Sequence, residues 1–223
     1  MEEVLKEGNR LYKKGGWDES INFLEKNRKF LIKDNETAEL EKIIGWSRYY
    51  KGIKCPEEEK NINIQDAVNN FKTALSLLTS LLLSEKEKEK DTEISVRNGL
   101  SLSLWILGKK KEAELESFKA TEKFPHELSA WNTRSILLRW AGDFKTSVNV
   151  CERVYQTAVA KKDFRTAGHG KQNKGDALVK LGKTTEAKED YKKALEMYKK
   201  YEKKTGESAN FHLKRVQEKL SSL

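Results

Sequence analysis

The chain has 223 residues, of which 37% are apolar and 35% charged, with a formal net charge of +9 and only two prolines. This length and apolar content suffice to bury a core, and they exclude an intrinsically disordered chain. Because proline breaks helices and the commonest residues include Lys, Glu, Leu and Ala, the composition favours an all-α fold.

The first predicted unit covers residues 1–34 and contains two helices. A helical stripe ends near Lys14, two glycines at 15 and 16 predict a turn, and Trp17 and Asp18 open a second stripe. This succession resembles the tetratricopeptide repeat, in which helix A and helix B form an antiparallel pair and repeats follow one another at a period of about 34 residues.

The second predicted unit covers residues 38–84. Its helix A contains Trp46 and ends at Gly52, and its helix B contains the small and aromatic pattern of Ala67, Phe71 and Ala74. In the repeat pattern the glycine that ends helix A and the first alanine of helix B are about five positions apart. Here the corresponding residues, Gly52 and Ala67, are 15 positions apart. We therefore expect an inserted polar loop at residues 53–63.

The third and fourth predicted units cover residues 94–127 and 128–161. Their turn glycines, Gly108 and Gly142, are 34 residues apart, which is the period of the repeat. Pro125 lies where the family closes a unit, and Asp143 with Phe144 completes a turn similar to that of the family.

The fifth predicted unit covers residues 168–201, and a terminal helix follows at residues 207–222. Gly182 precedes Ala187 and Tyr191 with the spacing of helix B. A terminal repeat needs a helix with a polar outer face to cover its apolar side. The stripe that would pack against the repeats consists of Phe211, Leu213, Val216 and Leu220.

Together the resemblance implies an all-α fold of antiparallel helix pairs, stacked as a right-handed tetratricopeptide-like α-solenoid with a C-terminal capping helix. It implies one repeat domain over residues 1–223. A glycine at the end of each helix A can adopt the left-handed backbone conformation. The glycines predicted to do so are Gly15, Gly52, Gly108, Gly142 and Gly182.

Residues for catalysis, cofactors or metals are not predicted. Residues 177–184 fit a loose phosphate-loop pattern, but they continue an amphipathic helix instead of following a strand. The three histidines lack a second ligand at helical spacing, and Cys55 and Cys151 are expected to be reduced thiols. A nucleophilic pair of Cys151 with a histidine stays open, although its position on a buried stripe favours packing.

The positive charge is confined to the C-terminal part. Residues 1–127 hold 23 Lys/Arg and 24 Asp/Glu, a net charge of −1, whereas residues 128–223 hold 21 and 11, a net charge of +10. Such an excess predicts an acidic partner at the C-terminal end, and a nucleic acid is the alternative.

The resemblance implies a concave groove, lined by the A helices, that binds a peptide or a partner protein. Large aromatic side chains are common anchors in such surfaces, although the same rings could instead pack against a neighbouring unit. The candidate partner-binding residues are Asn9, Tyr12, Lys13, Trp46, Tyr49, Tyr50, Asn98, Leu102, Trp105, Asn132, Ile136, Arg139, Trp140, Gln172 and Lys180.

The sequence thus predicts a non-enzymatic scaffold for protein–protein interaction. The alternatives are an RNA- or DNA-associated helical repeat that uses the basic C-terminal half, self-association through the groove, and a binding arm for a catalytic partner chain. Residues 81–83, a typical apolar run, are far shorter than the about 20 residues of a membrane span. The acidic residues 1–4 do not resemble a secretory signal, so we expect a cytoplasmic protein.

Overall fold

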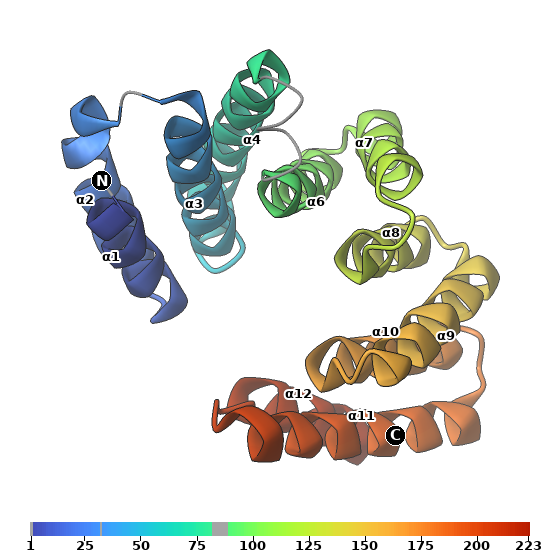
Figure 1. Ribbon diagram of the computed structural model, residues 1–223. Coiled ribbons are helices and arrows are strands. Elements are labelled where there is room, and N and C mark those ends of the chain that lie inside the picture. The colour runs from blue at the N-terminus through green and yellow to red at the C-terminus, as the bar shows by residue number, and fades with distance from the viewer. Residues whose placement is uncertain (1, 32, 82–88) are drawn as a thin grey trace. The chain divides into compact units, whose positions relative to one another are not determined.

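The computed structural model describes residues 2–31, 33–81 and 89–223, and this part of the chain contains eleven α-helices, one 3₁₀ helix and no strand (Figure 1). The prediction of an all-α fold built from helix pairs is therefore confirmed. The chain divides into two compact units, Met1–Glu122 and Lys123–Leu223. No described helix is both long enough and apolar enough to cross a bilayer.

The N-terminal unit consists of successive antiparallel helices. Apolar side chains between the first three of them form a core of Leu24, Leu31, Leu40, Ile43 and Ile44. The helices are α1 (Glu2–Lys13), α2 (Trp17–Asn27), η1 (Arg28–Phe30), α3 (Asp34–Gly52), α4 (Glu57–Ser80), α6 (Lys90–Ile106) and α7 (Lys110–Lys123).

Phe71 on α4 joins the second helix pair to the third. Its ring is fully buried between two glycines. A Cβ atom built on Gly45 of α3 would lie 2.7 Å from a ring carbon of Phe71, and one built on Gly99 of α6 would lie 2.3 Å away. Both glycines therefore provide the space that this ring occupies.

The inserted loop expected at residues 53–63 is a short turn followed by helix. Pro56 caps α4, which begins at Glu57 and carries three glutamates in its first turn, where the helix dipole favours negative charge. Ile64 in this extension is fully buried. The prediction of an inserted loop was wrong, because most of the surplus residues form the first turns of helix B instead of a loop before it. The predicted run of helix B beyond residue 81 lies outside the described residues.

Four of the five predicted turn glycines have a left-handed backbone, namely Gly15, Gly108, Gly142 and Gly182, with φ between 75° and 88°. Gly52 is the exception, because it is the last residue of α3 and is followed by a right-handed cap. A Cβ atom at Gly52 would lie 2.8 Å from Ile64. Close packing against the lengthened α4 explains this glycine.

The C-terminal unit contains α8 (Leu128–Trp140), α9 (Phe144–Ala160), α10 (Phe164–Lys180), α11 (Thr184–Thr205) and α12 (Asn210–Ser221). Asp143 and Asp163 cap α9 and α10. Each side chain accepts a hydrogen bond from the backbone N–H of the third residue of its helix. Helix α10 begins four residues before the expected start of the fifth unit at residue 168.

Helix α12 occupies the place of the predicted capping helix. Val216 is fully buried in a core with Tyr191, Ala194 and Tyr198 of α11, and Leu213 and Leu220 pack against this core. Phe211 was expected on the same stripe but is 67% exposed. At about 100° per residue, Phe211 lies on the face of the helix opposite to the other three.

Candidate partner-binding site

An aromatic surface lies on helices α1 and α3 and the first residue of α2 in the N-terminal unit. Tyr50 of α3 is at its centre, with its ring 6.0 Å from Tyr12, 6.2 Å from Trp17 and 5.8 Å from Trp46 between ring centres. The contacts with Trp17 and Trp46 are stacked, with interplanar angles of 18° and 29°. All four side chains are half-buried. We call Tyr12, Trp17, Trp46 and Tyr50 the N-terminal aromatic surface.

Contacts underneath fix the rings in place. The Nε1–H of Trp46 donates a hydrogen bond to Ser95 Oγ on α6 at 3.0 Å, and its ring meets Tyr49 and Phe71 edge-on. Tyr49 is buried. Tyr49 therefore supports the surface from below, whereas the sequence had placed it among the partner-contacting residues.

Trp17 belongs to the surface although it was not among the candidate partner-binding residues. It begins α2 directly after the glycine turn, which brings its ring onto Tyr50 of the next helix pair. The ammonium group of Lys54 lies 4.6 Å from the Trp17 ring. In a repeat, the turn between helices A and B lies close to helix A of the next repeat. A large aromatic residue directly after that turn could therefore have been predicted to contact the next helix A.

The remaining predicted residues of the N-terminal unit differ in exposure. Asn9 is half-buried and Lys13 exposed on α1. Asn98 and Leu102 of α6 are buried, with 7% and 8% of their surface exposed, so they have little area for a partner. Trp105 is half-buried, and Lys110 Nζ lies 5.5 Å from its ring centre.

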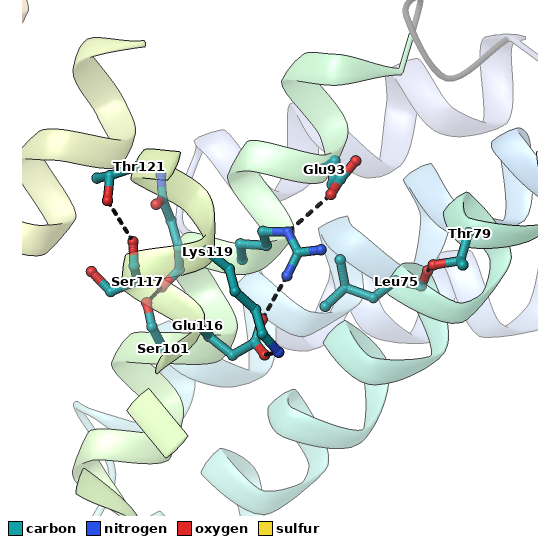
Figure 2. A network of polar contacts seen from close by, with 10 residues as sticks. Leu75, Thr79, Glu93, Ser101, Glu116, Ser117, Lys119 and Thr121 are labelled. Atoms are coloured by element: carbon teal, nitrogen blue, oxygen red, sulfur yellow. Dashed lines mark hydrogen bonds and ion pairs between the residues drawn. The ribbon is translucent and has the colours of Figure 1, made fainter. Parts of the chain in front are cut away.

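An ion-pair network fastens α6 to α7 (Figure 2). Arg97 of α6 donates to Glu93 at 2.9 Å and to Glu116 of α7 at 2.7 Å, and Lys119 pairs with Glu116 at 2.8 Å. The side chains of Arg97, Glu93 and Glu116 are each less than a fifth exposed. These charged groups pair with one another between α6 and α7. The network therefore holds α6 in position, and we do not assign a binding site to it.

In the C-terminal unit a buried carboxylate, Asp176 of α10, connects four helices. It accepts hydrogen bonds from Arg139 of α8 at 2.6 Å and from Tyr191 of α11 at 2.7 Å, and it pairs with Lys219 of α12. Burial, followed by the negative charge of Asp176, raises the pKa of Tyr191, and burial lowers the pKa of Lys219. Arg139, a predicted contact residue, is therefore engaged within the unit.

Two other predicted residues of this unit form hydrogen bonds within it, and the remaining three differ in exposure. Gln172 is buried and accepts a hydrogen bond from Tyr198 at 3.0 Å. Asn132 accepts one from Asn173 at 2.9 Å. Ile136 is half-buried, Lys180 is exposed, and Trp140 is 40% exposed.

Two histidines lie against Tyr198. His169 Nδ1 is 3.1 Å from the Tyr198 hydroxyl, and the His212 ring stacks on the Tyr198 ring with a centre distance of 5.0 Å. Burial is the largest cause that lowers the pKa of His169 to about 3 and that of His212 to about 4, and nearby positive charges add to it. Both imidazoles are therefore neutral at pH 7.

A metal-binding cluster is not found among the described residues, and the one cysteine considered as a nucleophile is buried. No group of three or more His, Cys, Asp or Glu side chains in this part of the chain could hold a metal ion. Cys151 is fully buried, and burial raises the pKa of its thiol, which disfavours the reactive thiolate.

Residues 169–201, which include most of α10 and α11, match the sequence profile of the tetratricopeptide repeat. This segment is a tetratricopeptide repeat. No curated protein matches the chain.

Solved structures with tetratricopeptide-like repeats share the fold. The chain is similar to the Podosopora anserina putative kinesin light chain with nearly identical TPR-like repeats, with 14% sequence identity, a TM-score of 0.62, and 91% of this chain and 96% of that chain covered. It is also similar to MamA, with 20% identity, a TM-score of 0.51, and 88% and 96% covered. At these identities the comparisons establish the tetratricopeptide-like helical fold.

Proposed function

We propose that the chain is a non-enzymatic scaffold that binds a peptide or partner protein, and that the N-terminal aromatic surface makes the principal contact. Stacks of helical repeats form extended surfaces that bind other polypeptides. The observation that supports this site is the ladder Trp17–Tyr50–Trp46, whose half-buried rings join the beginning of α2 to α3 of the next helix pair.

The packing of the ladder suits it for binding. Large aromatic rings contribute most of the binding energy in many interfaces, provided that they are held in place. Trp46 is fixed by Ser95 and Phe71, and Trp17 by Tyr50, so a partner would meet rings whose rotamers are already set. Ordering these side chains on binding would therefore cost little entropy.

A comparison of Tyr50→Ala with Tyr201→Ala tests this site. Both tyrosines are half-buried, but Tyr201 lies on α11 in the other unit. We expect affinity capture from a cell lysate with the full chain to identify partners whose binding weakens by about tenfold with Tyr50→Ala and is unchanged with Tyr201→Ala. Unchanged capture by a folded Tyr50→Ala variant would refute the site. Light scattering of the purified chain separates self-association from binding of another protein.

Nucleic-acid binding by the C-terminal unit is the second candidate. Helix α11 carries a lysine face, because its lysines at positions 188, 192, 199 and 203 fall within about 60° of one another around the helix. Lysines on one face can neutralise successive phosphates. A gel-shift experiment with single-stranded RNA tests this function, and the absence of a shift near physiological salt would exclude it.

A further inference from the structure

A small cavity lies between the beginning of α8 and the side of α9, entirely within the C-terminal unit. Its volume is about 150 Å³. Leu128 and Val154 provide apolar walls, while Trp131, Arg153 and Lys161 surround them. This cavity is separate from the N-terminal aromatic surface, so what it binds goes beyond the proposed function.

The walls of the cavity are held in place by two hydrogen bonds to the turn before α8. Trp131 Nε1 donates to the carbonyl oxygen of Pro125 at 2.8 Å, which fixes the plane of the indole. Lys161 Nζ donates to the carbonyl oxygen of His126 at 3.2 Å, which draws the end of α9 onto the same turn. The cavity is therefore formed before any ligand arrives.

The charge in the cavity is positive. The guanidinium of Arg153 lies 4.6 Å from the centre of the Trp131 ring. An arginine whose face covers an aromatic ring still has its N–H groups in the guanidinium plane, where they can bind a carboxylate with two hydrogen bonds. Lys161 has further N–H groups beyond the one bound to His126. No acidic side chain lines the cavity within the described residues.

Positive edges around an apolar floor match one chemical group, a carboxylate carried on a short aliphatic stem. The methylene groups of the stem can contact Leu128 and Val154 while the carboxylate meets Arg153 and Lys161. The same unit has a surplus of basic over acidic residues, which attracts acidic polypeptides from a distance. We propose that this cavity binds a glutamate or aspartate side chain of an acidic segment in a partner protein.

Titration of the full-length chain with an acetylated hexaglutamate amide tests the proposal, with the matching hexaglutamine peptide as control. The indole N–H resonance of Trp131, assigned through Trp131→Phe, reports on the cavity directly. We expect hexaglutamate to shift this resonance and hexaglutamine to leave it unchanged. Arg153→Gln should weaken binding by about tenfold, the usual effect of losing a charge-assisted hydrogen bond, and Lys161→Gln should weaken it as well.

Lys193→Gln is the matched control, because it removes one positive charge from the exposed surface of α11 outside the lysine face described above. It should change affinity by less than about twofold, since a distant exposed charge is screened by salt. Equal losses in Arg153→Gln and Lys193→Gln would indicate diffuse attraction and overturn the proposal, as would the absence of a Trp131 shift. A short oligothymidylate that moves the same resonance at lower concentration would replace the acidic polypeptide with nucleic acid. Circular dichroism confirms that each variant is folded.

Discussion

In the N-terminal unit aromatic rings pack between the second and third helix pairs, whereas in the C-terminal unit one buried carboxylate binds side chains from three other helices. In the first unit Phe71 fits between the glycine faces of α3 and α6, and Trp46 and Tyr50 stack above it. In the second unit Asp176 of α10 binds side chains from α8, α11 and α12. The two units share a plan of successive helix pairs but differ in the interactions that hold the pairs together.

This difference has consequences for binding. Aromatic contacts in the N-terminal unit leave part of the ring surface exposed, and this is the surface that we propose for a partner. In the C-terminal unit an ion pair engages Arg139, a charged A-helix residue that the sequence had assigned to a groove. The binding that we propose at this unit uses side chains outside the network, Arg153 and Lys161.

Removal of the central carboxylate should produce the largest effect. We expect Asp176→Ala to lower the free energy of unfolding by about 3 kcal/mol or more, because Arg139 and Lys219 would lose their buried partner. Urea denaturation followed by circular dichroism measures this change. Glu189→Ala on the exposed face of α11 is the control and should change stability by less than about 0.5 kcal/mol. A loss below about 1 kcal/mol for Asp176→Ala would show that the network contributes little.

Filling a glycine face should destabilise the N-terminal unit by a smaller amount. An alanine Cβ at Gly99 would meet Phe71 at 2.3 Å, so we expect Gly99→Ala to cost about 1–3 kcal/mol through overpacking. Phe71→Leu in the Gly99→Ala background should recover part of this loss, because the smaller side chain leaves room. Strictly additive losses in the double-mutant cycle would show that the ring and the glycine do not depend on each other.

Acidification should affect the C-terminal unit through His169. Its pKa is lowered from 6.5 to about 3 in the folded chain, so the folded state favours the neutral imidazole and the unfolded state takes up the proton first. The contribution of neutral His169 to the free energy of unfolding is therefore fully present above pH 6.5 and is lost as the pH decreases toward 3. We expect a loss of about 2 kcal/mol between pH 7 and pH 5. In His169→Gln this part of the pH dependence should disappear, and an unchanged pH profile would contradict the assignment.

Helix capping should give the smallest effect. Asp143 accepts a hydrogen bond from the Thr146 N–H, whereas Lys183 occupies the equivalent position before α11 without a side-chain cap. We expect Asp143→Ala to cost about 1 kcal/mol and Lys183→Asp to stabilise the unit by a few tenths of that. Thermal unfolding of both variants measures the difference. Destabilisation by Lys183→Asp would show that Lys183 makes a contact worth more than the cap.

Local features of the fold could be predicted because they depend on residues close together in the chain. The left-handed turns at Gly15, Gly108, Gly142 and Gly182 follow from glycine between two helical stripes. The extension of α4 was missed because a polar segment that begins with proline and glutamates is equally suited to a loop or to the first turn of a helix. Only the burial of Ile64 against Gly52 decides between them.

The candidate site was predictable only in part. Trp46, Tyr12 and Tyr50 were identified because large aromatics at helix A positions indicate a binding face. Trp17 and the Trp131–Arg153 cavity were not among the predicted contact residues, since their roles depend on neighbours 22 to 33 positions away. The amino-acid sequence by itself determined the helix pairs and their turns, because backbone propensity and hydrophobic periodicity act over a few residues. The tertiary structure alone decided which rings stack and which charges pair, because those contacts exist only after distant helices pack together.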